Sequence, residues 1–351
     1  MDSKGTLLVF RFSAMGDVAM SASVLREFCA RYPDWNVIFV SRSVFKPFFT
    51  DIPKLRFVSL LPDSKHRGLR GLYSLFSELN KFKPSAIADL HNNLRTKILC
   101  YYFRILKNIP SVQLDKGRSE KKALTRIENK VLVPLRSTPE RYADVFRKLG
   151  FEIHLSHQLQ KNKKELPTSI KQAFEDSERR FVGISPFAKH KEKVYPLEKM
   201  QLVIEELSAK GIETFIFGGG PEEAQTAEDW EAKYPGVTSL IGKYNLSEEL
   251  QIISNLDLML SMDSAGMHMA SLMGTKAISV WGATHPFAGF LGYGQSDEDT
   301  IQIDLYCRPC SVFGNRKCYR GDHACMYGID SGMIVESIVK KLDDGKRSFP
   351  Y

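Results

Sequence analysis

The residues with the clearest chemical potential lie around SMDSAGMH, where an apolar run gives way to a helical stretch. Asp263, Ser264, Gly266 and His268 stand at the start of this expected helix, and Thr284 ends the next expected strand. A helix N-terminus presents free backbone N–H groups and the positive end of the helix dipole, which together bind anions such as phosphate. The alternative is that Asp263 is a helix cap and His268 a structural histidine. The second polar turn at Thr284 favours a phosphate site.

Two other stretches in the same half of the chain place charged residues after an expected strand. Lys193 belongs to a basic loop that follows FVGIS at 181–185, and a lysine ammonium is a compact cation suited to phosphate. A solvated loop is the alternative. Glu222 follows the glycines at 218–220, which allow the backbone to approach a ligand closely. A carboxylate there accepts hydrogen bonds from a sugar or ribose hydroxyl, although the glycines match neither the Walker nor the G-x-G-x-x-G spacing.

An acid also stands where the first expected strand gives way to a helix. TLLVFRF leads into a tight turn with Gly16, and Asp17 follows at the head of the helix. One interpretation is an N-terminal cap, which contributes about 1 kcal/mol to helix stability. The other is a general base, whose carboxylate removes a proton within hydrogen-bond reach.

Alternating strands and helices must position these residues. Short apolar runs alternate with helical stretches through the first third of the chain, a polar and basic passage follows at 156–178, and the alternation then restarts. This pattern is typical of parallel sheets with helices on both faces. We therefore predict an α/β protein with two doubly wound domains at 1–160 and 178–330, then a C-terminal helix and tail at 331–351. Ligands of such sheets bind at the carboxyl ends of strands, where most of these polar residues fall.

The composition is that of a globular protein that prefers anionic partners. Of the 351 residues, 43% are hydrophobic and 26% are charged, which is too apolar for a disordered chain. The formal net charge of +8 favours phosphorylated substrates, anionic lipid surfaces or nucleic acid. No apolar run is long enough to span a bilayer, and the N-terminus lacks a signal-peptide cleavage pattern. We therefore expect a cytoplasmic protein.

Four of the six cysteines form a late cluster with the spacing C-x2-C-x7-C-x6-C, at Cys307, Cys310, Cys318 and Cys325. Four thiols in so short a stretch suit tetrahedral zinc, and C-x2-C is the usual first half of such a site. The second pair is more widely spaced than usual, so two alternatives stay open: four reduced thiols packed in a loop, or a disulfide between two of them. A structural zinc ion is the metal hypothesis, because no base accompanies an open ligand position.

Five motifs follow one another along the chain. They are S-x-x-G-D ending at Asp17, K-x-[YW]-P from Lys193, G-G-G-x-E-E around Glu222, D-[ST]-x-x-x-H from Asp263 to His268, and W-G-x-T-x-P around Thr284. In this order and spacing, from about Leu7 to Met326, the chain resembles the family 9 glycosyltransferases, the ADP-heptose:lipopolysaccharide heptosyltransferases. The resemblance implies the GT-B fold, in which two Rossmann-like domains face each other across a cleft. The first domain would take the acceptor and the second the nucleotide-sugar.

The resemblance also implies roles for individual residues. Asp17 matches the family's proposed catalytic base. Lys193 matches a lysine near the donor phosphates, and Glu222 matches an acid associated with the donor's ribose. Asp263 and His268 match the acid and the histidine of the donor-site signature.

Other positions of the chain either match the family pattern or depart from it. Ser264 follows the signature acid, and Thr284 falls in the next G-x-T turn. His285 stands where an acid is common in the family, and Ala188 and Lys189 stand where some members carry small hydroxyl residues. These departures leave the sugar and the nucleotide open.

The reaction implied is a single inverting displacement. Asp17 removes a proton from an acceptor hydroxyl as that oxygen attacks the anomeric carbon, and Lys193 and the backbone near Ser264 meet the charge of the departing diphosphate. We expect transfer of a heptose or related sugar, from ADP-heptose, to a lipopolysaccharide inner-core acceptor, with no cofactor required for catalysis. The alternatives are another GT-B nucleotide-sugar enzyme, such as a different transferase or an epimerase, and a zinc-bearing nucleic-acid-binding protein. Basic regions that are not strongly aromatic disfavour nucleic acid.

Basic residues gather in the N-terminal half, on both sides of the stretch LYSLF. They are Lys65, His66, Arg67, Arg70, Arg95, Lys97, Lys116, Arg118, Lys121 and Lys122. A lipid-linked phosphorylated sugar acceptor and the anionic inner leaflet would both be attracted to such a surface. A solvated helix face is the alternative for any one of these residues, but as a group they predict peripheral association with the inner face of the cytoplasmic membrane.

Overall fold

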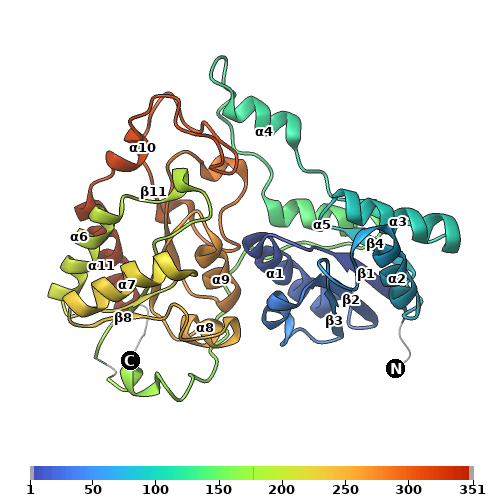
Figure 1. Cartoon of the computed structure of the whole chain (residues 1–351), viewed down its shortest axis with the longest axis horizontal. Coiled ribbons are helices and arrows are strands. Elements are labelled where there is room, and N and C mark those ends of the chain that lie inside the picture. Colours follow the sequence, from blue (N-terminus) through green and yellow to red (C-terminus); the bar gives the residue numbers. More distant parts are fainter. Residues whose placement is uncertain (1–3, 177, 348–351) are drawn as a thin grey trace. The chain divides into compact units, whose positions relative to one another are not determined.

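The computed structural model describes residues 4–176 and 178–347, which divide into two compact units (Figure 1). Within these ranges, unit 1 comprises the residues up to Gly117 and Arg136–Ser156, and unit 2 comprises Arg118–Leu135 and the residues from His157 onward. The tail of the predicted segment 331–351 falls partly at 348–351, outside the described residues. Each unit contains its own parallel sheet and its own core.

The sheet of unit 1 has the strand order β3-β2-β1-β4-β5, with every pairing parallel. Its strands are β1 (Gly5–Phe10), β2 (Trp35–Arg42), β3 (Leu55–Leu60), β4 (Ala86–Asp89) and β5 (Ser111–Gln113). The central strands β1, β2 and β4 are mainly apolar and largely buried, as a parallel sheet covered on both faces requires, whereas the edge strands β3 and β5 are partly exposed. The strand order reverses between β1 and β4: β2 and β3 follow on the side of β1, and β5 follows on the side of β4.

The helices of unit 1 are α1 (Met15–Arg31), α2 (Gly68–Asn80), α3 (Leu94–Lys107) and α5 (Thr138–Lys148), with a 3-10 helix η1 (Ser43–Phe49). Helices α2 and α3 pack together over one face of the sheet, where Phe76 and Phe103 join a core with Leu8 and Phe10. Helices α1 and α5 also pack against each other, and the rings of Phe28 and Phe146 stack between them with centroids 4.8 Å apart.

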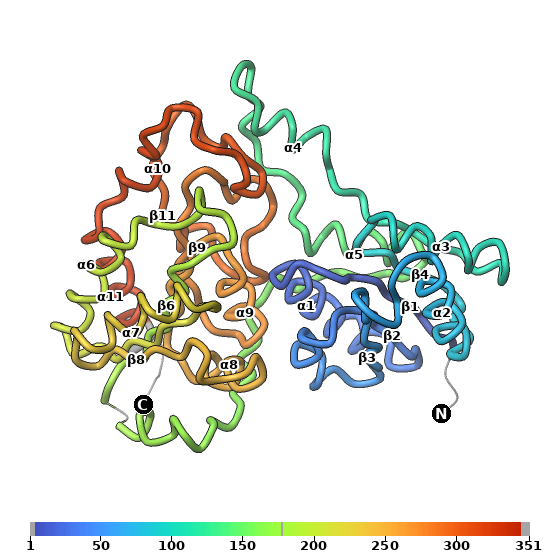
Figure 2. The backbone as a smooth tube through the Cα atoms, viewed as in Figure 1, coloured from blue at the N-terminus to red at the C-terminus, as the bar shows by residue number. Residues whose placement is uncertain are grey.

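The sheet of unit 2 has the strand order β11-β10-β9-β6-β7-β8, also with parallel pairings. Its strands are β6 (Phe181–Ser185), β7 (Glu213–Ile216), β8 (Val237–Ser239), β9 (Leu258–Met262), β10 (Ala277–Val280) and β11 (Thr300–Ile301). Strands β6 and β9 run side by side, with Ser185 opposite Ser261 at their carboxyl ends (Figure 2). The strand order reverses between them.

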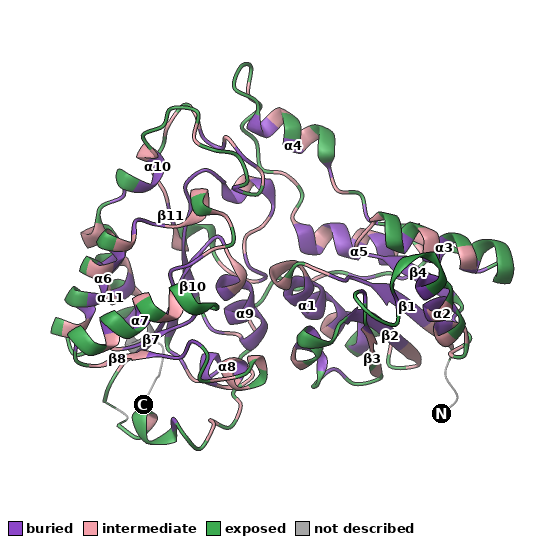
Figure 3. Ribbon diagram, viewed as in Figure 1, coloured by how far each residue is buried: buried purple, intermediate pink, exposed green. Residues whose placement is uncertain are grey.

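The helices of unit 2 are α4 (Arg118–Thr125), α6 (Leu197–Ala209), α7 (Pro221–Lys233), α8 (Leu246–Ile253), α9 (Ala265–Met273), α10 (Ala324–Tyr327) and α11 (Ser331–Arg347). The 3-10 helices are η2 (Lys171–Phe174), η3 (Lys191–Lys193), η4 (Pro286–Ala288) and η5 (Asp297–Asp299). Helices α6, α7 and α11 share one core with alternate residues of β6, β9 and β10. Helix α9 packs against β9 and β10 and contacts α8. In Figure 3 these strands are drawn as buried and the outer sides of α6 and α7 as exposed.

The predicted α/β class and the two doubly wound sheets are confirmed. The division into units differs from the simple split expected near residue 160. Residues 118–135 leave unit 1 and pack with unit 2, where the Lys130 ammonium donates to the carbonyl of Cys307 at 2.8 Å. Helix α11 belongs to unit 2 because its apolar side is part of that unit's core.

Candidate functional site

The head of α9 lies at the point where the strand order of unit 2 reverses. Gly266 lies so close to β6 that a Cβ atom there would be 2.5 Å from the Cβ of Ser185, so only glycine fits. The backbone N–H of Met267 donates to the Ser261 hydroxyl at 3.0 Å. The N–H groups ahead of it have no partner within the helix, as at any helix start. Sequence and packing together present these groups at the carboxyl edge of the sheet, where α/β proteins bind ligands.

An ion pair joins two of the predicted site residues beside this helix start. The Lys193 ammonium lies 2.9 Å from the Asp263 carboxylate, and their side chains are only 16% and 5% exposed. Gly314 packs against the methylenes of Lys193 so closely that any side chain there would clash. The structure therefore contradicts the alternatives in which Asp263 is a helix cap and Lys193 lies in a solvated loop. The cap position of α9 is Ser264.

Ser264 and His268 complete the head of the helix. The Ser264 hydroxyl is hydrogen-bonded to the Ser261 hydroxyl at 3.2 Å and does not cap α9. His268 is buried one turn further along the same helix. Four predicted residues, Lys193, Asp263, Ser264 and His268, thus belong to one local arrangement with a lysine cation at a helix N-terminus, which is suited to an anion.

Thr284 follows β10 and is completely buried. Its carbonyl accepts a hydrogen bond from Arg308 at 3.1 Å, whereas its hydroxyl oxygen has no partner among the residues that the structure describes. A buried hydroxyl without a partner is uncommon, and a water or a ligand usually satisfies it. The side chain of Thr284 is therefore buried, whereas a polar residue in an ordinary surface turn would be exposed.

Glu222 lies in the first turn of α7 and is exposed. Its neighbour Glu223 turns back, and its carboxylate accepts a hydrogen bond from the Gly219 N–H at 2.7 Å. Gly220 has a φ of +106°, which favours glycine at the start of this helix. The glycines therefore shape the turn after β7 and leave the Glu222 carboxylate free to face solvent.

Asp17 occupies the corresponding point of unit 1, after β1. Its carboxylate accepts a hydrogen bond from the Ala14 N–H at 3.3 Å and forms an ion pair with Arg11. The Asp17 side chain is 27% exposed and that of Arg11 is 8% exposed. The cap position of α1 is Ala14, and Asp17 lies at the third helical position, from which its carboxylate binds the N–H of the cap residue. Asp17 thus stabilises the start of α1 without being its cap residue, and part of its carboxylate is exposed.

Three polar residues near Asp17 were not singled out from the sequence. Arg11 donates to the Leu90 carbonyl at 2.8 Å, and Asp89 accepts from the backbone of His91 at 3.0 Å. The ring nitrogen Nδ1 of His91 accepts from the Phe12 N–H at 3.1 Å. Burial, reinforced by the positive charge of Arg11, lowers the pKa of His91 to about 3, so the ring is neutral. A charged residue within TLLVFRF and the D-L-H ending of another apolar strand were the signals that could have found them.

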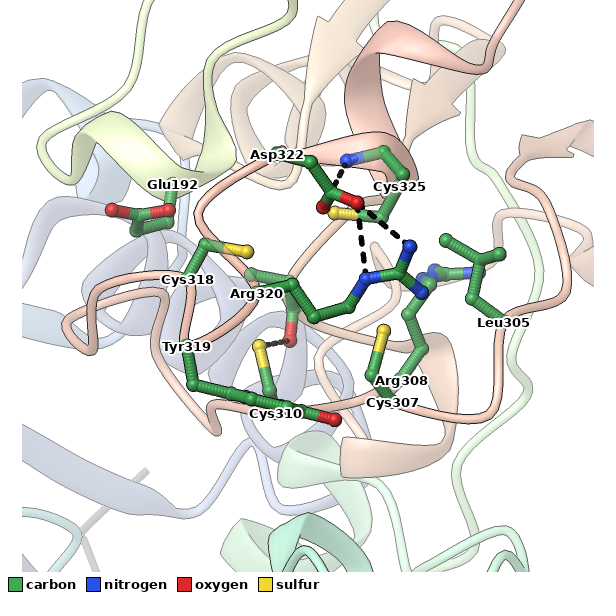
Figure 4. Close-up of a pocket in the computed structure, with 12 residues that line it drawn as sticks. Glu192, Leu305, Cys307, Arg308, Cys310, Cys318, Tyr319, Arg320, Asp322 and Cys325 are labelled. Carbon is green, nitrogen blue, oxygen red and sulfur yellow. Dashed lines mark hydrogen bonds and ion pairs between the residues drawn. The ribbon is translucent and has the colours of Figure 1, made fainter.

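The four late cysteines line one small pocket together with Arg308 and Arg320 (Figure 4). All six cysteines of the protein are free thiols. Burial raises the pKa of the Cys325 thiol to about 11, and burial also raises the pKa of Cys310. Across the described ranges, no three His, Cys, Asp or Glu side chains are grouped as a metal site. The zinc hypothesis therefore stays a prediction.

Comparison with known proteins places the chain in a family. The model of glycosyltransferase family 9 (heptosyltransferase) matches residues 73–318. The chain belongs to glycosyltransferase family 9. This glycosyltransferase is 25% identical to the lipopolysaccharide core heptosyltransferase OpsX of Haemophilus influenzae over 289 residues, which cover 80% of each protein.

Solved structures show the fold. A family 9 glycosyltransferase from Veillonella parvula has a TM-score of 0.74 at 18% identity, with 98% of this chain and 99% of that chain covered. The E. coli heptosyltransferase WaaC with ADP has a TM-score of 0.68 at 16% identity, with 96% and 99% covered. The units of this glycosyltransferase are those of the GT-B fold. The family match includes Lys193 and Asp263, whereas Asp17 precedes it.

Proposed function

We propose that this glycosyltransferase transfers a heptose from ADP-heptose to a lipopolysaccharide inner-core acceptor, with inversion at the anomeric carbon. The family and the names of its similar proteins support the sugar and the acceptor. The structural observation that carries the proposal is the Lys193–Asp263 pair at the head of α9. A fixed lysine cation beside helix N–H groups that have no partner within the helix is what a nucleoside diphosphate requires.

In this proposal each residue of the site makes a different contact with the donor. Asp263 holds the Lys193 ammonium in place, so that the lysine meets the diphosphate with little reorganisation. Ser264 and His268 lie along the first turns of α9 and contribute further polar contacts. Glu222 takes the ribose hydroxyls, and the Thr284 hydroxyl gains a partner when the donor binds.

The proposed reaction is one displacement. Asp17 accepts the proton of an acceptor hydroxyl while the oxygen of that hydroxyl forms a bond to the anomeric carbon. The bond from that carbon to the diphosphate breaks, and ADP leaves with the electron pair. Lys193 and the N–H groups of α9 stabilise the negative charge on the leaving diphosphate.

We also propose that these cationic groups make a divalent cation unnecessary for transfer. Lys193 supplies the positive charge that a metal ion provides in other nucleotide enzymes. Transfer rates in EDTA should equal those in magnesium. A rate that requires added magnesium would contradict this proposal.

For the late cysteines we propose one structural zinc ion held by Cys307, Cys310, Cys318 and Cys325. Four thiols around one pocket have the ligand types of a tetrahedral zinc site. Among the residues that the structure describes, the buried Arg308 donates to carbonyl and amide oxygens, and the thiolates of such a site would balance its charge. Elemental analysis of the purified protein should find about one zinc per chain, and less in Cys310→Ser. Wild-type protein that contains no zinc after purification without chelators would contradict the proposal.

The acceptor is proposed to be a lipid-linked phosphorylated sugar, reached by peripheral association with an anionic membrane surface. Exposed basic residues of unit 1 support this partner, namely Lys65, Arg67, Arg70, Arg95 and Lys97. Two residues of the predicted basic surface, His66 and Lys121, are buried, and residues 118–122 belong to unit 2. Among the described residues, no helix is both long and apolar enough to cross a bilayer.

A thermal-shift panel of ADP-, UDP-, GDP- and CMP-sugars tests the donor proposal. The wild-type protein should be stabilised by ADP-sugars above the others, since ligand binding to the folded state raises its melting temperature. The shift should disappear in Asp263→Ala. A larger shift with another nucleotide would favour a different GT-B enzyme, and no shift with any nucleotide would contradict donor binding.

A further inference from the structure

Helix α3 carries two apolar stripes on opposite sides. Leu99, Cys100 and Phe103 are buried in the core that α3 shares with α2. A second stripe has the spacing i, i+7, i+11, and its members are Leu94, Tyr101 and Ile105. With 3.6 residues per turn, this spacing places the second stripe on the side facing away from the core. Ile98 lies between Leu94 and Tyr101 but is partly buried and packs against the core.

The second stripe is exposed to an unusual degree. Leu94, Tyr101 and Ile105 are 75%, 62% and 61% exposed. The outer side of α3 is drawn as exposed along most of its length in Figure 3. Single exposed apolar residues need no explanation, but a contiguous row of large ones marks an interaction surface.

The charges around this stripe have one sign. Arg95 lies on one side of the stripe, and Lys97 and Arg104 lie on the other, all of them exposed. The helix sequence LRTKILCYYFRILK contains no acidic residue. A row of apolar side chains between basic side chains is the pattern of a helix that lies in a membrane interface.

The neighbouring helix extends this surface. Tyr73 of α2 meets Tyr102 of α3 edge to face, with ring centroids 5.8 Å apart. Leu69 lies one turn before Tyr73, and both are exposed. Arg67 and Arg70 are exposed beside them, while Glu78, the acid of α2, is paired with Lys65. The two helices thus form one basic and apolar surface, which we name the α2–α3 face.

We propose that the α2–α3 face docks this glycosyltransferase on an anionic lipid bilayer, with α3 lying in the plane of the interface. The inference rests on the proposed function for its choice of partner and identifies the surface that makes the contact. Lipid headgroups neutralise the basic residues, while the acyl boundary takes up the apolar stripe. A second copy of this face would oppose like charges, and a nucleic acid would leave the apolar stripe in water.

Vesicle co-sedimentation without any sugar tests the proposal. The wild-type protein should bind vesicles of equal parts phosphatidylethanolamine and phosphatidylglycerol, and not phosphatidylcholine alone. Two variants of α3 test the apolar and the basic residues separately. The apolar variant is Tyr101→Ser with Ile105→Ser, and the charge variant is Arg95→Gln with Lys97→Gln and Arg104→Gln. Each should weaken partitioning by at least about tenfold, because apolar insertion and headgroup attraction both contribute. Added salt should weaken wild-type binding but have less effect on the charge variant.

Matched controls come from exposed residues of unit 2. Leu202→Ser with Met333→Ser removes a similar apolar area, and Lys163→Gln with Lys171→Gln and Lys340→Gln removes the same charge. Both controls should bind vesicles like the wild type. All variants should keep the wild-type melting temperature, so that lost binding is not lost folding.

The failure of this inference is distinguishable from a failure of the proposed function. The Tyr101→Ser/Ile105→Ser variant should transfer sugar to a delipidated, water-soluble acceptor at the wild-type rate. Equal vesicle binding by the wild type, the apolar variant of α3 and the charge variant of α3 would overturn the proposal that the α2–α3 face docks on the bilayer. Concentration-dependent dimerisation that only these two variants of α3 lose, with no vesicle binding by the wild type, would also overturn it. Vesicle binding without any heptose transfer would instead refute the proposed function alone.

Discussion

The two sheets place an acid at the same topological position but surround it differently. Asp17 follows β1 and Asp263 follows β9, each beside the strand where the order reverses, and each pairs with a cation. Asp263 is 5% exposed and its partner lysine 16%, whereas Asp17 is 27% exposed and its partner arginine 8%. In unit 2 the acid is more buried than its cation, and in unit 1 the cation is more buried than the acid. These exposures fit the proposed roles, in which unit 2 presents a cation to the donor diphosphate and unit 1 presents a carboxylate to the proton of the acceptor hydroxyl.

Asp17→Asn should have the largest effect. The amide keeps the shape of the side chain but cannot accept the acceptor's proton, so the turnover number should fall by about 10²–10⁴-fold while donor affinity stays unchanged. Steady-state kinetics with a donor titration measure both. Asp17→Glu is the matched control and should retain part of the activity. Turnover of Asp17→Asn near the wild-type rate would leave this residue with only its role at the start of α1.

Lys193→Met should weaken donor binding by about 10–100-fold, because one charge-assisted contact to the diphosphate is lost. Methionine keeps the length of the stem that packs against Gly314. The neighbouring exposed Lys191 provides the control, since Lys191→Met removes the same charge from the same loop. Equal effects of the two substitutions would show that only the net charge of the loop matters.

Gly266→Ala should destabilise the folded protein by about 1–3 kcal/mol, because the new methyl group meets Ser185 at the end of β6. Urea unfolding measures the change. Gly219→Ala is the control, since a Cβ there meets no atom within 4 Å. An unchanged stability of Gly266→Ala would mean that the head of α9 is not held against the sheet.

His91 provides a smaller, pH-dependent test of unit 1. Its pKa is lowered from 6.5 to about 3, first by burial and then by Arg11, so the unfolded chain takes up a proton that the folded protein does not. The stability from the neutral ring is therefore complete above pH 6.5 and declines as the pH falls toward 3. Between pH 7 and about pH 5, the wild type should lose about 1–2 kcal/mol more than His91→Gln. The exposed His154→Gln should follow the wild type, and parallel curves for wild type and His91→Gln would contradict the buried neutral ring.

The sequence predicted most of this architecture because strand and helix patterns are local. The alternation of apolar runs was sufficient for two parallel sheets, and their order placed Asp17 and Asp263 at strand ends. The cap of α8 is Asn245, whose side chain accepts hydrogen bonds from the backbone N–H groups of Ser247 and Glu248. Helix ends are set by such short contacts, which a pattern cannot distinguish over two residues.

Contacts between distant parts of the chain were harder to predict. The pairing of Lys193 with Asp263 joins residues that the sequence could only propose separately. Likewise, no local signal indicated that residues 118–135 pack with unit 2, since that depends on partners far along the chain. The burial of Thr284 and the neutral state of His91 depend on tertiary packing in the same way.

Calorimetric titration of ADP tests the division of roles between the two acids most directly. The account predicts that Lys193→Met binds ADP about 10–100-fold more weakly than the wild type, while Asp17→Asn binds it with wild-type affinity. Weaker ADP binding by Asp17→Asn, with unchanged binding by Lys193→Met, would contradict it.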